Sequence, residues 1–260
     1  MSTFLFDRII FGPVWSRRLG ESLGINLLPL ANKYCNFNCL YCECGFTAQS
    51  YGKHRNELPG VAEVLDALNQ TLSNCREQYV MIDTITFAGN GEPTLHPEFA
   101  DIIDGTVEAR NKYYPKSKIA VLSNATLIAN PLVRKSLLKV DYNILKLDSV
   151  NEETVRLINC PFGNFSLPGL LKNLKDFRGN LTLQTLFIKG EYQGRSFDNS
   201  SDNEVQNWLD FLKILRPELV MIYTFRRDTP INTVQKISPE RLYEIASKVE
   251  ALGIQVSVSV

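Results

Sequence analysis

Three cysteines in the first fifth of the chain, Cys35, Cys39 and Cys42, stand at spacings of four and three residues. Thiolates are soft ligands that suit iron–sulfur clusters and zinc. A structural zinc ion normally takes four ligands, and Cys44 and His54 could complete such a set. Three thiolates alone would instead leave one iron of a 4Fe–4S cube open to a substrate or cofactor. The spacing therefore predicts a metal centre, either a zinc ion or a cluster with an open iron.

The composition indicates a folded chain without an overall charge. Of 260 residues, 44% are apolar and 22% charged, with 28 Lys plus Arg and 28 Asp plus Glu. These values exclude disorder and a global attraction to nucleic acid or anionic lipid. Four of the six cysteines fall within residues 35–44, which favours ligands over disulfides. No apolar run reaches about 18 residues and the chain does not begin like a signal peptide, so we expect a cytoplasmic protein.

Apolar segments of strand length alternate with longer segments of helical periodicity after a turn-rich N-terminal extension. This alternation predicts βα units around a parallel sheet, and therefore an α/β fold. The expected strands are 22–29, 83–88, 118–123, 142–147, 181–188, 219–225 and a seventh at 255–260, and the expected helices are 61–77, 97–112, 131–139, 167–177, 202–215 and 239–252. Without a linker or repeat, residues 1–260 form one expected domain.

Residues that could bind a ligand lie within or just after each of the first six predicted strands. In parallel α/β barrels, the loops at the carboxyl ends of the strands converge and carry the chemistry. Any α/β protein has some polar loops, but polar groups at six matching places favour one shared site. These groups are the cysteines, Gly91 and Glu92, Ser123 and Asn124, Lys146 and Asp148, Gln184 and Thr185, and Tyr223 to Arg227.

The cysteine loop resembles that of the radical S-adenosylmethionine superfamily. Cys35, Cys39, Tyr41 and Cys42 match its C-x3-C-x2-C pattern, with an aromatic residue before the last cysteine. The resemblance implies a 4Fe–4S cluster held by the three cysteines, S-adenosylmethionine as the second cofactor, and a single partial (β/α)6 barrel. Six complete βα units precede the seventh strand, which agrees with that barrel.

The resemblance also implies which residues bind S-adenosylmethionine. Gly91 and Glu92 resemble the family's Gly-Gly-Glu element, which holds the methionine amino group, although Asn90 replaces the first glycine. Capping of the helix after Pro93 is the alternative role for Glu92. Ser123 and Asn124 are similar to the element that contacts the ribose or carboxylate.

Two further residues are implied at the cofactor. Tyr41 would lie near the adenine or pack within its loop. Lys146 would bind the cofactor carboxylate or form a salt bridge with Asp148. Of the remaining cysteines, we expect Cys44 to be a free thiol near the ligands and Cys160 to lie in a loop that faces either the substrate or the protein interior.

The activity implied by the resemblance is reductive cleavage of S-adenosylmethionine. The cleavage yields a 5′-deoxyadenosyl radical that abstracts hydrogen from an unknown substrate, with electrons from a donor such as flavodoxin or ferredoxin. A second enzymatic hypothesis is that the protein is a glycyl-radical enzyme activase. The non-enzymatic hypothesis is a zinc-binding interaction module.

Residues 12–20, 22–26, 91–95 and 223–230 resemble a branch grouped with the tRNA wyosine-base synthases. A tRNA substrate would need a local basic patch, because the chain as a whole is neutral. The candidates are Arg17, Arg18, Lys53, Arg55, Arg226 and Arg227. The alternative to RNA binding is that these side chains form solvent-exposed salt bridges at the rim. Wyosine synthases carry a second cluster, whereas no cysteine precedes Cys35 here.

Overall fold

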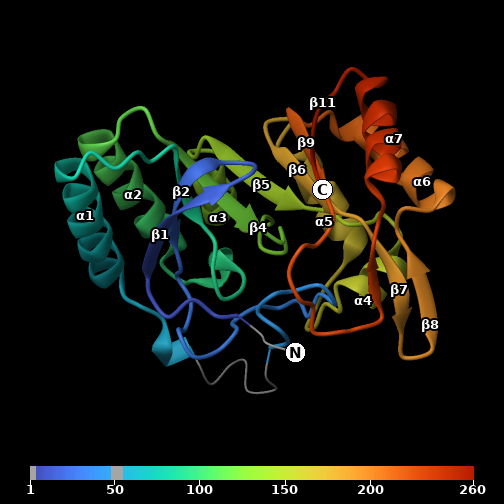
Figure 1. Ribbon diagram of the computed structural model, residues 1–260, viewed down its shortest axis with the longest axis horizontal. Coiled ribbons are helices and arrows are strands. Elements are labelled where there is room, and N and C mark those ends of the chain that lie inside the picture. Colours follow the sequence, from blue (N-terminus) through green and yellow to red (C-terminus); the bar gives the residue numbers. More distant parts are fainter. Residues whose placement is uncertain (1–3, 48–54) are drawn as a thin grey trace.

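One curved sheet forms the centre of the computed structural model, which describes residues 4–47 and 55–260 (Figure 1). Its order is β1-β2-β3-β4-β5-β6-β9-β11, with β1 antiparallel to β2 and all other neighbours parallel. The strands are β1 (Ile10–Ser16), β2 (Gly20–Ile25), β3 (Thr84–Phe87), β4 (Lys118–Ser123), β5 (Tyr142–Lys146), β6 (Thr182–Leu186), β9 (Leu219–Tyr223) and β11 (Gln255–Ser259). The predicted partial barrel and its seventh parallel strand are confirmed.

Helices connect the parallel strands and pack on the outside of the sheet (Figure 1). They are α1 (Val61–Glu77), α2 (Phe99–Tyr113), α3 (Pro131–Leu137), α4 (Glu152–Ile158), α5 (Leu167–Lys175), α6 (Asp202–Leu215) and α7 (Pro239–Glu250). α1 and α6 have the predicted bounds because their apolar residues repeat at helical spacing, as with the buried Val64, Leu68 and Leu72. No helix in the described ranges is long and apolar enough to cross a membrane.

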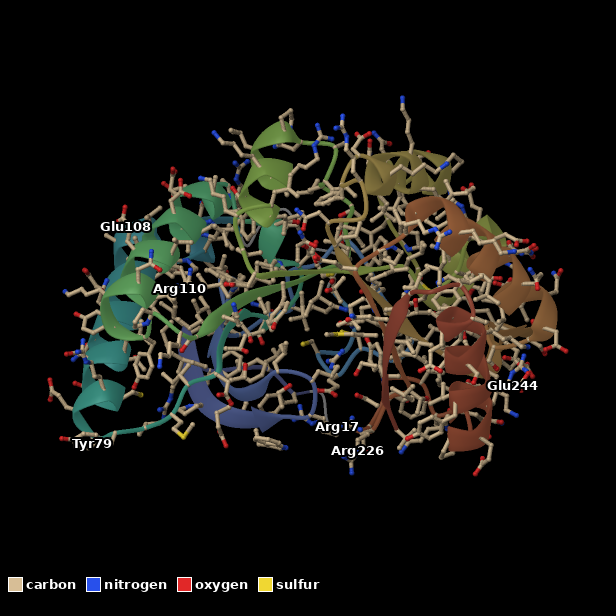
Figure 2. All side chains as sticks on the ribbon, turned by 90° about the horizontal axis from the view of Figure 1, so that it is seen from above. Arg17, Tyr79, Glu108, Arg110, Arg226 and Glu244 are labelled. Atoms are coloured by element: carbon tan, nitrogen blue, oxygen red, sulfur yellow. The ribbon has the colours of Figure 1, made fainter. Side chains whose placement is uncertain are left out.

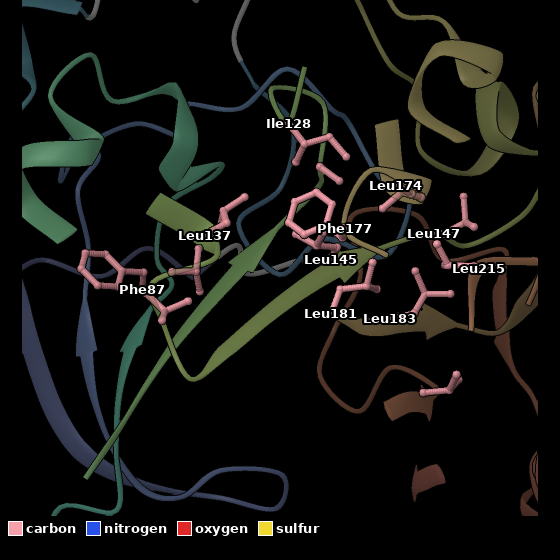
Figure 3. Packing of buried hydrophobic residues seen from close by; sticks show 14 of the residues in the cluster. Phe87, Ile128, Leu137, Leu145, Leu147, Leu174, Phe177, Leu181, Leu183 and Leu215 are labelled. Carbon is pink, nitrogen blue, oxygen red and sulfur yellow. The ribbon is translucent and has the colours of Figure 1, made fainter. Parts of the chain in front are cut away.

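The main hydrophobic core lies between the sheet and these helices (Figure 3). Leu145 of β5 and Leu183 of β6 are fully buried in it, together with Leu174 and Phe177 from the end of α5. Each such side chain contributes about 1.5–3 kcal/mol when it leaves water. This core fixes the strands, so the loops at their carboxyl ends are carried on a rigid frame.

Some elements were not predicted. The expected N-terminal extension contains β1, whose pairing is irregular between Phe11 and Val14, so it lacks the period-two pattern of a strand. α4 was missed as a short helix of seven residues. A second sheet, ordered β10-β7-β8, was also missed; it consists of β7 (Ile188–Tyr192), β8 (Arg195–Asp198) and β10 (Val234–Lys236).

The turn between β1 and β2 reaches across the concave side of the main sheet. Leu19 packs in a small cluster with Ala120, Ile144 and Met221 from three different strands. Arg17 of the same turn donates a hydrogen bond to the main-chain oxygen of Val260, just after β11. The turn therefore connects the two ends of the sheet and covers the open side of the partial barrel.

Candidate active site

The cysteine loop follows β2 and is attached to two distant segments. Tyr34 pairs with Gly91 in a β-bridge, and its carbonyl accepts a hydrogen bond from the Glu92 amide at 3.1 Å. Further along, Phe37 pairs with Pro161 in a second bridge. The loop therefore lies between the turn after β3 and the segment after α4.

The first attachment depends on a glycine. Gly91 has a φ of +147°, and a Cβ there would lie 2.0 Å from the Tyr34 carbonyl oxygen, so a larger residue would push the loops apart. Asn90, which replaces the family's first glycine, is fully buried, and its side-chain amide donates to the carbonyls of Phe6 and Pro29. This departure from the family pattern thus has a structural role.

One cavity of about 220 Å³ brings the predicted site residues together at the carboxyl ends of the strands. A larger hollow of about 500 Å³ beside α5 contains none of the cysteines. The predicted residues that line the smaller cavity are Cys35, Cys39, Cys42, Tyr41, Gly91, Glu92, Ser123, Asn124 and Lys146. Lys33, Cys44, Gln184 and Tyr223 line it as well.

Glu92 is buried, with only 2% of its surface exposed, and its two oxygens are used unequally. Oε1 accepts hydrogen bonds from Thr94 N at 3.1 Å, Thr94 Oγ1 at 2.5 Å and Ser123 Oγ at 2.8 Å. Among the residues that the structure describes, Oε2 accepts from the backbone amide of Asn124 alone, at 2.5 Å. Glu92 thus does cap the short 3-10 helix Pro93–Leu95, and Oε2 keeps a lone pair on a side chain that lines the cavity.

Tyr41, Lys146 and Asp148 form a buried polar cluster beside Cys39. The Lys146 ammonium lies 2.8 Å from the Tyr41 hydroxyl and 3.5 Å from Asp148 Oδ2, and Tyr41 also donates to Asp148. Asn159, which follows α4, donates to Asp148 Oδ2 at 2.7 Å and to Cys39 Sγ at 3.4 Å. The predicted salt bridge of Lys146 is present, and the cluster joins it to a cysteine.

The thiols differ in acidity. Burial raises the pKa of Cys35 to about 12 and also raises that of Cys39. A hydrogen bond from Cys44 lowers the pKa of Cys42 to about 5, against the effect of burial, and the ammonium of Lys33 lowers it further. Cys42 is therefore the thiol that ionises most readily at neutral pH.

Lys33 was missed by the sequence analysis. It is 6% exposed, and its ammonium donates to the Gly45 carbonyl at 2.7 Å. Burial lowers its pKa, but the thiols of the three predicted ligands raise it more, so the net shift is upward. The one available signal was its position two residues before Cys35 in a loop expected to hold a metal centre.

The comparison with protein families identifies the family of the chain. A model described as the radical SAM superfamily matches residues 32–193, which include every cysteine of the loop. The chain belongs to the radical SAM superfamily.

A Helicobacter pylori protein called UPF0026 protein is 30% identical over 249 residues, which cover 95% of this chain and 75% of that protein. A radical SAM methyltransferase from Sphaerobacter thermophilus superposes with a TM-score of 0.66 at 16% identity, over 92% of this chain and 65% of that one. A structure of TYW1 with a lysine–pyruvate adduct bound gives a TM-score of 0.58 at 11% identity, over 88% of this chain and 73% of that one. These solved structures show the fold alone.

The donors around the cysteines fit a cluster of the radical SAM type. Within residues 4–47 and 55–260, no three His, Cys, Asp or Glu side chains are grouped closely enough for a single metal ion. Asn124 Nδ2 lies 3.8 Å from Cys35 Sγ and Phe37 N lies 3.4 Å from it, which are contacts that stabilise cluster thiolates.

The remaining cysteines and basic residues singled out in the sequence lie in different places. Cys44 is a free thiol in the cavity, as expected. Cys160 donates to the Leu157 carbonyl at 3.2 Å and packs beside the cysteine loop rather than in the cavity wall. Of the basic residues, Arg227 pairs with Glu43 and Arg55 is exposed. His54 and Lys53 lie outside the described residues.

Proposed function

We propose that this protein is an iron–sulfur enzyme that reductively cleaves S-adenosylmethionine, with residues 1–260 as its core domain. The observation that carries the proposal is that the three cysteines and Glu92 line one cavity at the carboxyl ends of parallel strands. This is the edge of an α/β barrel where chemistry is normally found. Family membership supports the same reading.

In this proposal Cys35, Cys39 and Cys42 bind three irons of a 4Fe–4S cluster. The bound cluster and S-adenosylmethionine together supply a radical that abstracts hydrogen from the substrate. The protein contributes buried N–H donors at the sulfurs, from Asn124 to Cys35 and from Asn159 to Cys39. These donors favour the thiolate form of both ligands, which burial alone disfavours.

Glu92 and Lys146 bind the two charged ends of the methionine moiety. The free lone pair of Glu92 Oε2 accepts from the methionine ammonium. Ser123 and Asn124 donate to Glu92 and hold its carboxylate in place. The Lys146 ammonium contacts Tyr41, Asp148 and Tyr223. In this proposal the methionine carboxylate replaces one of these neutral hydroxyl partners, because a carboxylate is the stronger acceptor for an ammonium. Reduced flavodoxin or ferredoxin supplies the electron.

The test is anaerobic reconstitution of the full chain with iron and sulfide. We expect about four irons and four sulfides per chain, and release of 5′-deoxyadenosine and methionine when S-adenosylmethionine and a reductant are added. Cys35→Ala, Cys39→Ala and Cys42→Ala should each abolish both signals. Cys75→Ala is the matched control, because Cys75 lies on α1 away from the cavity.

Two results would overturn the proposal. Retention of a complete cluster in all three single variants would remove the ligand assignment. One tightly bound zinc per chain, without sulfide, would favour the interaction module instead.

A further inference from the structure

Three arginines gather where the β1–β2 turn meets the far end of the sheet. Arg17 and Arg18 belong to the turn, and Arg226 follows β9. Figure 2 shows Arg17 and Arg226 next to each other at the lower edge of the view, and Arg226 is close enough to lower the pKa of Arg17. The group therefore draws on both ends of the sheet and borders the open side of the barrel.

One nitrogen of the Arg18 guanidinium lacks a hydrogen-bond acceptor. Its Nη1 is buried and has no hydrogen-bond partner among the described residues. Its guanidinium lies 4.7 Å from the centre of the Tyr223 ring, and Tyr223 lines the cysteine cavity. A buried N–H group of a charged side chain is costly to leave unpaired, so this position favours a ligand that supplies an acceptor.

No acidic side chain among the described residues pairs with this positive charge, although Arg17 donates a hydrogen bond to the main-chain oxygen of Val260. None of the ion pairs found in residues 4–47 and 55–260 includes Arg17, Arg18 or Arg226, whereas the neighbouring Arg227 pairs with Glu43. Burial lowers the pKa of Arg17, and the nearby Arg226 and Arg18 lower it further. Three like charges held together are more stable once an anion lies between them.

We infer that Arg18, together with Arg17 and Arg226, binds an oxyanion group of the substrate, a phosphate or a carboxylate, at the open side of the barrel. The planar guanidinium presents two parallel N–H groups that match either oxyanion. Tyr223 connects the two regions, because its ring lies against Arg18 and its hydroxyl contacts Gln184 in the cavity. The inference rests on the proposed function only in taking the anion as part of the substrate.

The test is calorimetry on the full chain with inorganic phosphate and with acetate at constant ionic strength. Wild-type protein should bind at least one of them, and the preferred anion identifies the substrate group. Arg18→Gln and Arg226→Gln should each weaken binding about 10-fold or more, and Arg18→Lys should restore only part of it. Arg226 is exposed, so its variant should fold even if Arg18→Gln does not. Arg178→Gln, at an exposed position after α5, should bind as wild type does.

Bulk tRNA separates a phosphate on RNA from a small anion. Three phosphate contacts predict that log affinity falls with log salt at a slope of about −2 to −3, flattened in Arg18→Gln. No binding of either small anion, or equal binding by wild type and both Gln variants, would overturn the inference. Cluster content and S-adenosylmethionine cleavage are measured separately. If the protein binds phosphate but no cluster, the proposed function is wrong and the anion site is still supported.

Discussion

The Asn124 backbone amide lies 2.5 Å from Glu92 Oε2 and donates to it, so the loop after β4 holds the carboxylate that follows β3. Because Oε1 is already occupied by Thr94 and Ser123, Oε2 is the oxygen left to meet a ligand. Two neighbouring strands thereby set the position and direction of one acceptor. This relationship leads to the first prediction.

Glu92→Gln should leave the cluster intact and weaken S-adenosylmethionine binding about 10–150-fold, because a charge-assisted hydrogen bond of roughly 1.5–3 kcal/mol is lost. Anaerobic calorimetry measures the affinity. Ser123→Ala is the control, since it removes one bond to Oε1 but keeps the charge, and its effect should be smaller. If Glu92→Gln binds the cofactor normally, Glu92 acts only as a helix cap.

In cluster-free protein, Cys42 should react with iodoacetamide before Cys35 does. A group with a pKa of about 5 is ionised throughout the neutral range, whereas one with a pKa of about 12 is almost fully protonated there. Cys44→Ala removes the hydrogen bond that lowers the Cys42 pKa, so labelling of Cys42 should then need a higher pH. Peptide mass spectrometry across pH 5–9 reads out each site. Equal labelling of both thiols at pH 6 would contradict the assignment.

Lys33→Met should lower the reduction potential of the reconstituted cluster, because a buried positive charge favours the added electron. The ammonium interacts electrostatically with all three cysteines, so we expect it to contribute about 50–100 mV. Lys33→Arg keeps the charge and should restore most of the potential. Spectroscopic redox titration makes the measurement. A potential unchanged in Lys33→Met would show that the ammonium serves only to hold the Gly45 carbonyl.

Asp148→Asn should destabilise the fold by about 3–5 kcal/mol, because it leaves Lys146 as a buried charge without its counter-ion. The Asp148 side chain is fully buried, and its other oxygen accepts from the Leu186 amide at 3.0 Å. Urea unfolding measures the change. Asp210→Asn breaks an exposed pair with Lys213 and should leave the unfolding midpoint unchanged. Equal midpoints for the two variants would show that the buried pair is not needed.

The sequence predicted those parts of the site that depend on local spacing. The cysteine motif, the glycine before Glu92 and the Ser123–Asn124 pair could be located because each follows a recognisable strand. Asn159 could not, since its importance comes from contacts with Cys39 and Asp148 that form only in the folded protein. The sequence drew attention to its neighbour Cys160 instead, whose thiol donates to the Leu157 carbonyl and does not line the cavity.

For the fold too, local patterns could be predicted and long-range pairing could not. α6 was predicted to the residue because seven of its side chains are buried at helical spacing. β1 was missed because Val14 and Trp15 are exposed at 51% and 72%, so its apolar residues do not alternate. Its place in the sheet follows from pairing with β2, which no local pattern reveals.

The attachment of the cysteine loop to the segment after α4 has a consequence for biosynthesis. Asn159, which donates to Cys39 Sγ, lies 120 residues further along the chain, and Pro161 pairs with Phe37 from a similar distance. While the ribosome makes those later residues, the thiols have neither their donors nor their cover. Domains fold as units once their sequence has emerged. Iron and sulfide delivered to the nascent loop would therefore meet exposed cysteines, and stable loading of the proposed cluster would wait until Asn159 and Pro161 have been made.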